Sequence, residues 1–250
     1  MNQMPLSLVF IIFLFTVVGC SSTQEIDSSS AEGAYKLGEI YRKDERYQDS
    51  IAQFEVVKNK FPYSRLATMA ELQIADINYD REAYIEAQNA YQIFKELHPG
   101  HEKIDYVTYR LALSFFMQLP DSIDRDLTLA EQAVLYFDEV IHSYPTSEYV
   151  APAQEKKAET LKKLAQKELY IAHFYFIREM FDSSLGRYED LLRKYPKLGF
   201  DEEALYGAIL SSAHVKDLRK RDFYFEKLKK NHPDSKWTRQ AQQELADGIE

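Results

Sequence analysis

Apolar and small side chains recur at helical spacing from Ala31 to Pro62, in two runs separated by a polar stretch. The first run holds Ala34, Leu37, Gly38 and Tyr41, and the second holds Tyr47, Ser50, Phe54 and Val57. Spacings of three and four residues gather each run on one face of a helix, and a proline such as Pro62 stops a helix because it lacks a backbone N–H. The segment predicts two antiparallel helices that cross closely at Gly38 and Ser50.

The same pattern returns four more times. Leu37 and Ile74 lie 37 residues apart, as do Pro62 and Pro99, and later copies end at Pro145, Pro196 and Pro233. The pattern resembles the tetratricopeptide repeat (TPR), a helical hairpin with a usual period of about 34 residues. Because one hairpin cannot bury its apolar face alone, we expect an all-α fold, a TPR-like solenoid of about five stacked hairpins.

The third repeat carries extra residues between its helices. It measures 46 residues from Pro99 to Pro145, and the surplus falls in residues 118–127. Thr128 and Glu131 have the spacing of a capping box, which would restart the helix after this insertion. A loop of this length in a compact repeat indicates a function or an old insertion.

The last two repeats are also irregular. Helical spacing continues from Ser147 to Phe181, which predicts one helix of roughly 30 residues and about 45 Å. The fifth repeat is the weakest, with Arg221 where a small residue is expected. Since terminal repeats commonly act as caps, we expect Trp237 to cover the end of the stack.

The chain begins with an apolar run over residues 6–18, too short to span a bilayer comfortably. It has the character of the core of a secretory signal, although no Lys or Arg precedes it. The following Val17-Val18-Gly19-Cys20 resembles the bacterial lipobox. The alternatives are an ordinary signal peptide with an incidental cysteine, or a short anchor helix.

The lipobox resemblance implies that residues 1–19 are a signal peptide and that Cys20 becomes the new N-terminus. Its thiol would carry a diacylglycerol and its amine a further acyl chain such as palmitate, which is more than stable anchoring needs. Ser21 in place of Asp implies transfer to the outer membrane. Residues 20–33 then form a flexible, polar tether on the periplasmic side.

Composition and motifs limit the partners and the classes of function that we expect. The formal net charge of −9 disfavours nucleic acid and anionic lipid as partners, and a single cysteine excludes an internal disulfide. We find no catalytic motif and expect neither an enzyme nor a cofactor beyond the lipid on Cys20. His98 and His101 resemble half of a metal site, but His98 and His232 directly precede prolines, so capping of helix carbonyls is the simpler interpretation.

The first helix of each TPR hairpin lines the groove of the stack. In the first three repeats these positions are predominantly aromatic, and we assign them to a peptide groove: Tyr35, Arg42, Leu72, Tyr79, Tyr106, Tyr109 and Phe116. Such a groove suits an extended peptide that carries aromatic side chains of its own. The alternative is that several of these tyrosines belong to the core between repeats.

A more specific resemblance rests on the lipobox, the insertion and two segments. The segments run over residues 122–149, with Asp124-Arg125-Asp126, and over residues 187–196, with the pattern Arg-x-Glu-x-x-Leu-Arg-x-Tyr-Pro. Together they resemble the BamD (ComL) family, the TPR lipoproteins of the β-barrel assembly machinery in Gram-negative outer membranes. The resemblance covers essentially all of the chain after the signal peptide.

The resemblance implies a non-enzymatic scaffold on the periplasmic face of the outer membrane. Residues 34–147 would receive the C-terminal segments of unfolded outer-membrane proteins, which end in an aromatic residue. Residues 148–250 would dock on a POTRA domain of a BamA-type protein through Arg187, with Arg178 and Tyr175 nearby. Other lipoproteins of the machinery are further partners that this family implies.

Two other functions remain open at this point. A TPR lipoprotein could serve as a scaffold in pilus secretion or in a Tol-Pal or cell-wall system. The insertion at 118–127 and the motif at Arg187 favour the assembly machinery over these. A periplasmic hydrolase or metal-dependent enzyme has almost no support in the sequence.

Replacing the proposed lipid-bearing residue tests the anchor. We expect Cys20→Ala to leave the outer-membrane fraction, because no thiol remains to accept a diacylglycerol. The measurement is membrane fractionation of cells that express the variant. Normal fractionation of Cys20→Ala would show that the cysteine is not the anchor.

Overall fold

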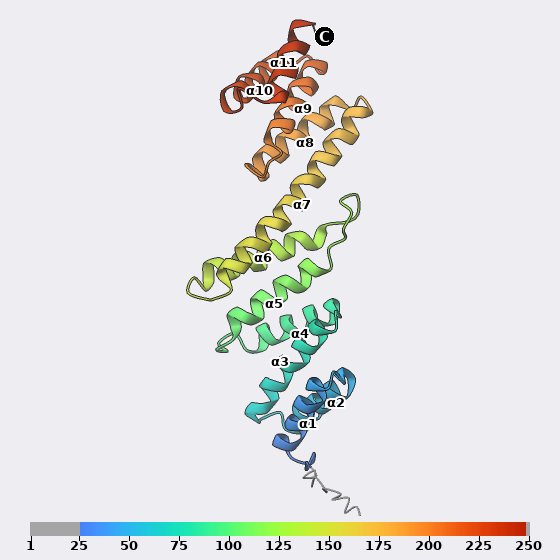
Figure 1. Ribbon diagram of the computed structural model, residues 1–250, viewed down its shortest axis with the longest axis vertical. Coiled ribbons are helices and arrows are strands. Elements are labelled where there is room, and N and C mark those ends of the chain that lie inside the picture. Colours follow the sequence, from blue (N-terminus) through green and yellow to red (C-terminus); the bar gives the residue numbers. More distant parts are fainter. Residues whose placement is uncertain (1–25, 249–250) are drawn as a thin grey trace, which may run out of the picture.

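The structure, a computed structural model, describes residues 26–248, and over that range eleven helices stack into an elongated solenoid (Figure 1). Consecutive helices pack against each other. The hairpins α1–α2, α3–α4, α5–α6, α7–α8 and α9–α10 confirm the predicted all-α TPR-like fold, and α11 packs on α9. The helices are α1 (Ala31–Lys43), α2 (Tyr47–Lys60), α3 (Arg65–Asp80), α4 (Tyr84–Leu97), α5 (Ile104–Met117), α6 (Thr128–Ser143), α7 (Val150–Ile177), α8 (Phe181–Lys194), α9 (Asp201–His214), α10 (Leu218–Asn231) and α11 (Lys236–Ala246).

Four of the five hairpins turn in the same way. The middle residue of each turn has a left-handed backbone, with φ between 57° and 62°: Glu45, Glu82, Glu179 and Lys216. The next N–H then bonds to a carbonyl five residues back, as from Arg46 to Tyr41 at 2.8 Å. This is a Schellman helix end formed without glycine, at a cost of about 1 kcal/mol per turn. The remaining hairpin, α5–α6 in the third repeat, has the predicted insertion instead.

The C-cap residue of the second helix of each hairpin directly precedes a proline. These five residues have φ between −126° and −140° and ψ between 50° and 60°: Phe61, His98, Tyr144, Tyr195 and His232. The proline ring disfavours the helical conformation for the residue that precedes it. The prolines therefore fix the period of the stack, as the sequence indicated.

The predicted close crossing in the first hairpin is confirmed. The hydroxyl of Ser50 donates to the carbonyl of Gly38 at 2.7 Å. A Cβ on Gly38 would lie 2.9 Å from the ring of Phe54, which is fully buried. The fourth hairpin repeats the contact, because the hydroxyl of Ser184 donates to the Ala172 carbonyl at 3.0 Å.

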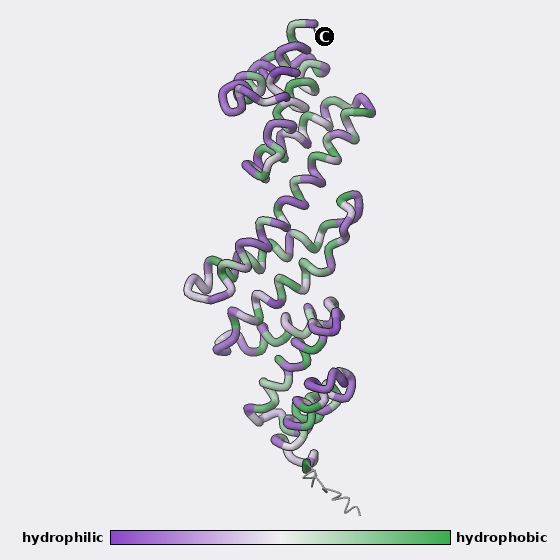
Figure 2. Tube along the Cα trace, in the orientation of Figure 1, coloured by the Kyte–Doolittle hydropathy of each residue, from purple (hydrophilic) through white to green (hydrophobic). Residues whose placement is uncertain are grey.

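Helix α7 joins two halves of the molecule. Ala153 near its start belongs to the hydrophobic cluster of α3 to α6, whereas Leu169 and Ala172 belong to the cluster with α8 and α9. We call α1 to α6 the N-terminal half and α8 to α11 the C-terminal half. Figure 2 shows apolar and polar residues alternating along the helices, as expected for helices that bury only one side.

The predicted capping box at Thr128 and Glu131 is wrong. The N-cap of α6 is Leu127, which has no side-chain bond. Asp126 accepts bonds from the N–H of Thr128 at 3.0 Å and from its hydroxyl at 2.6 Å. The carboxylate of Asp126 thus accepts from the backbone N–H of Thr128, the group to which the Glu131 side chain was expected to bond.

The other boundaries differ slightly from expectation. Helix α7 has 28 residues and spans about 42 Å, shorter at both ends than the predicted 147–181. Helix α1 begins at Ala31 and is capped by Ser30, so residues 31–33 of the predicted tether are helical. Trp237 packs against Tyr206 of α9 with ring centroids 5.0 Å apart, which confirms its place at the end of the stack. Cys20 and the predicted signal peptide lie outside the described residues.

Gly207 on α9 is a position where a side chain has no room. A Cβ there would lie 2.1 Å from the ring of Tyr188, which is buried. We expect Gly207→Ala to lower the free energy of unfolding by about 1–3 kcal/mol through overpacking, as measured by urea denaturation.

Gly186 on α8 provides the matched control. Nothing lies within 4 Å of a Cβ at that position, so Gly186→Ala should raise the free energy of unfolding by about 0.5–1 kcal/mol, because alanine is the better helix former. Equal stability of the two variants would contradict the contact between Gly207 and Tyr188.

Candidate functional site

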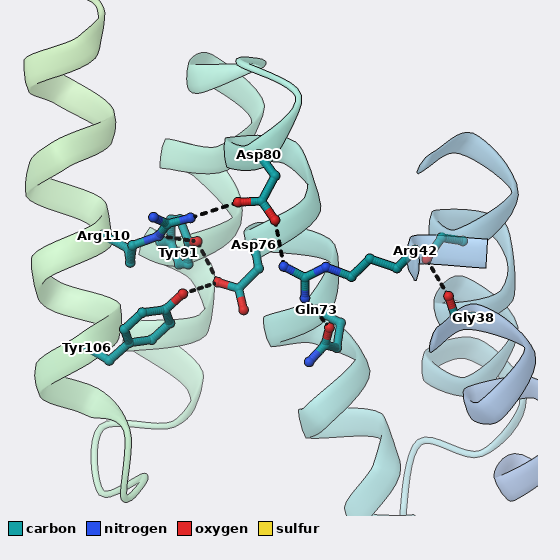
Figure 3. A network of polar contacts seen from close by, with 9 residues as sticks. Gly38, Arg42, Gln73, Asp76, Asp80, Tyr91, Tyr106 and Arg110 are labelled. Carbon is teal, nitrogen blue, oxygen red and sulfur yellow. Dashed lines mark hydrogen bonds and ion pairs between the residues drawn. The ribbon is translucent and has the colours of Figure 1, made fainter. Parts of the chain in front are cut away.

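A ladder of charged side chains crosses the first helices of three successive repeats (Figure 3). Asp80 on α3 accepts from Arg42 on α1 at 2.6 Å and from Arg110 on α5 at 3.3 Å. Arg42 also donates to Gln73. These side chains are partly exposed, so each pair contributes only about 0–1 kcal/mol to stability. The ladder mainly fixes the relative positions of α1, α3 and α5.

Asp76 is a buried carboxylate beside this ladder. It accepts from the hydroxyl of Tyr91 at 2.6 Å and from that of Tyr106 at 2.8 Å, and Arg110 Nε donates to the Tyr91 oxygen at 3.1 Å. Burial, and then the nearby carboxylate, raises the pKa of both tyrosines above the usual value. Both hydroxyls therefore stay protonated and keep donating to Asp76.

Three other predicted groove residues contact neighbouring elements. The Arg110 guanidinium lies 3.6 Å over the centre of the Tyr79 ring. Tyr109 stacks on Tyr149, which precedes α7, with ring centroids 5.2 Å apart. Phe116 packs against Phe137 of α6 at 6.5 Å. Contacts within and between repeats thus use much of this aromatic surface, as the alternative interpretation anticipated.

A pocket of about 600 Å³ lies in the N-terminal half, and we call it the N-terminal pocket. Two buried residues of the predicted groove, Tyr35 and Leu72, line it. Met69 and Leu97 add exposed apolar surface. The polar part of the lining contains two cations, Arg65 and Lys103, and one acid, Glu102. Its other polar members are Thr68, Gln73, His98 and His101.

The predicted capping role of the histidine side chains is wrong. His98 Nε2 lies 2.7 Å from a carboxylate oxygen of Glu71, and His232 Nδ1 lies 3.1 Å from one of Glu202. The backbone N–H of each histidine bonds to the helix carbonyl instead. Within residues 26–248, no group of three or more His, Cys, Asp or Glu is arranged to hold a metal ion.

A second pocket, of about 740 Å³, lies in the C-terminal half, and we call it the C-terminal pocket. Tyr175 and Arg187, two of the three predicted docking residues, line it together. Arg178 is not in the lining, and its guanidinium lies 3.6 Å over the Phe174 ring. The remaining lining residues are Ser183, Gly186, Glu189, Asp190, Leu192, Arg193, Phe223, Tyr224 and Lys227.

Within residues 26–248, Arg187 pairs with one carboxylate, that of Glu168. Its Nη1 lies 3.2 and 3.4 Å from the two carboxylate oxygens of Glu168 on α7. The Arg187 side chain is 40% exposed, whereas that of Glu168 is 16% exposed. An arginine has five N–H donors arranged as a fork, so the guanidinium can bind a second carboxylate while Glu168 keeps its orientation.

The sequence did not identify the wall of this pocket that α10 supplies. Phe223 is exposed, and Tyr224 donates to Glu189 of α8 at 2.8 Å. Both lie in the fifth repeat, whose pattern is the weakest. The signal available in the sequence was the pair Phe223 and Lys227, which are four residues apart and therefore lie on the same face of a helix.

A sequence model of one protein family matches residues 27–216, which include α1 to α9. The family is YfiO, described as outer membrane lipoprotein. The chain belongs to the YfiO family. This match and the similarity to relatives named outer membrane protein assembly factor BamD confirm the resemblance drawn from the sequence.

Two relatives illustrate the similarity. The outer membrane protein assembly factor BamD of Neisseria meningitidis serogroup A is 26% identical over 75% of this chain and 73% of its own length. The BamD of Rickettsia prowazekii is 27% identical over 88% of each chain. Among solved structures, that of the type IV pilus biogenesis factor PilW aligns over 84% of this chain and 97% of PilW, at 14% identity. The TM-score of this alignment is 0.39.

The description of the YfiO family also concerns how its members associate with a membrane. The family is one of outer membrane lipoproteins. In the part of the chain that the structure describes, no helix has the length and apolar character needed to cross a bilayer. The match starts at residue 27 and does not include the predicted lipobox.

Proposed function

We propose that this YfiO-family protein is a non-enzymatic scaffold for the assembly of outer-membrane proteins. A lipid on Cys20 holds it at the periplasmic face of the outer membrane. Its C-terminal half docks on a POTRA domain of a BamA-type protein, and its N-terminal half receives the C-terminal segments of unfolded outer-membrane proteins. The observation that carries the proposal is the family match over residues 27–216, together with relatives named as assembly factors.

The chemistry of the N-terminal pocket supports the receiving role. Met69, Leu72 and Leu97 supply apolar surface for an aromatic side chain. Arg65 and Lys103 supply positive charge for a terminal carboxylate. A peptide that ends in an aromatic residue presents both groups within one residue, so the two parts of the pocket match it together.

A peptide-binding measurement tests this role. We expect a ten-residue peptide ending in phenylalanine to bind, and Met69→Glu to weaken the affinity at least tenfold, because the new carboxylate would lie in the apolar part of the pocket and repel the terminus. Amidation of the peptide should also weaken binding. Fluorescence anisotropy with the full chain gives both affinities.

Met117→Glu is the matched control, because Met117 is exposed to a similar extent, 43% against 39%, and lies outside the pocket. If the two variants bind equally, or if the free-acid peptide does not bind, the pocket is not the receiving site.

The C-terminal pocket supports the docking role. Arg187 presents unused donors there, beside the exposed ring of Phe223 and the cation of Lys227. A partner carboxylate that reaches Arg187 would form a charge-assisted pair in a partly desolvated site, where such pairs contribute most to specificity. The acidic docking residue that the family resemblance implies has this chemistry.

Arg187→Gln should weaken binding to the POTRA domains of the BamA-type protein at least tenfold and make the residual affinity less dependent on salt. The free energy of unfolding should fall by no more than about 1 kcal/mol, because the pair with Glu168 is partly exposed. Surface plasmon resonance and chemical denaturation measure the two quantities.

Arg219→Gln, which changes an exposed arginine of α10 outside the pocket, is the control. If Arg187→Gln binds as tightly as the wild type, Arg187 is not part of the interface. Absence of any wild-type binding would contradict the docking role itself.

A further inference from the structure

The 118–127 segment contacts α7 as well as the two helices that it connects. Lys163 Nζ donates to the carbonyl of Pro120 at 2.8 Å, and Lys167 Nζ donates to the carbonyl of Arg125. The two lysines are one helical turn apart on the same face of α7. They therefore hold the segment near both of its ends. Figure 1 shows the segment beside the middle of α7.

The same segment is anchored on the N-terminal half. The amide of Gln118 donates to the Ser114 carbonyl at 2.9 Å and to the Gln88 side chain at 2.9 Å. At the other end, Leu127 is buried and Asp126 caps α6. Because both ends are fixed, a force on the segment is transmitted to the third repeat.

The part of α7 that the segment contacts is the connection between the halves. It lies between Ala153 and Leu169, which belong to different hydrophobic clusters. Within the described helices, none of α1 to α6 packs extensively on α8 to α11. Long helices are rarely straight and commonly curve. A bend in α7 near Lys163 would rotate one half of the molecule relative to the other.

We infer that residues 118–127 are a strut that fixes the angle between the two halves by bracing the middle of α7. The lysine ammonium groups bind backbone carbonyls, so the brace depends on the path of the segment more than on its side chains. It holds the N-terminal pocket and the C-terminal pocket in one relative orientation. The inference concerns geometry alone and stands independently of the proposed function.

Distances between spin labels in the two halves test the strut. In a chain with Cys20→Ser, labels are placed on cysteines at the exposed positions Glu96 of α4 and Lys230 of α10. We expect Lys163→Met with Lys167→Met to at least double the width of the distance distribution, because both donors are lost while the side-chain stems remain. Double electron–electron resonance measures the distribution.

Lys162→Met is the matched control, since Lys162 is exposed on the same turn and has no hydrogen bond or ion pair within the described residues. It should leave the distribution unchanged. A label pair inside the N-terminal half, at Lys60 and Glu131, should be unaffected by every variant.

The strut is refuted if the double variant keeps normal helicity by circular dichroism and gives the wild-type distribution. If the double variant loses helicity, the two single variants replace it under the same criterion. Broadening that appears equally in Lys162→Met would also overturn the inference, because it would then reflect a general loosening of α7.

Discussion

The stack depends on a large aromatic side chain that the second helix of a hairpin contributes to the core. In the first four repeats the rings are Phe54, Tyr91, Phe137 and Tyr188, each at most 2% exposed. Tyr188 packs on His173 of its own repeat and against Gly207 of the next. Tyr91 likewise has a hydrogen-bond partner in its own repeat, Asp76, and one in the next repeat, Arg110. Loss of such a ring typically costs about 3–5 kcal/mol. The contact between repeats, and not the isolated hairpin, is therefore the unit of stability.

Local signals made the helices predictable. A proline fixes the conformation of the residue before it, and a small residue permits a close crossing, so the hairpins and the long α7 could be derived from spacing alone. The errors arose where several polar groups compete for one site. Asp126 caps α6 in place of Thr128, and the side chains of His98 and His232 pair with glutamates that lie 27 and 30 residues earlier in the sequence. Such choices depend on tertiary neighbours that spacing does not reveal.

The candidate sites were less predictable than the fold. Arg187 and Tyr175 came from family resemblance, and the structure places both in one pocket, but its wall from α10 depends on how the weakest repeat packs. The residues predicted to line a groove are joined by polar and aromatic contacts across repeats, and their role in peptide binding stays a prediction. The groove prediction could not foresee that Asp80 would join Arg42 and Arg110, 38 and 30 residues away, because ion pairs across repeats follow from the stacking register.

The acidic composition of the chain is compatible with basic pockets, because salt screening limits the distance over which charges interact. At physiological salt the field of an exposed charge decays over about 8 Å. A large anionic surface such as a nucleic acid or a membrane would face many of the carboxylates that give this chain its net charge of −9. In the N-terminal pocket a single carboxylate faces Arg65 and Lys103 with one acid, Glu102. In the C-terminal pocket it faces Arg187, Arg193 and Lys227 with two acids, Glu189 and Asp190. The cations outnumber the acids in each pocket, and acids outside it are screened. Net charge therefore disfavours extended anions as partners, whereas the binding of one carboxylate group is decided by the few side chains that line the pocket.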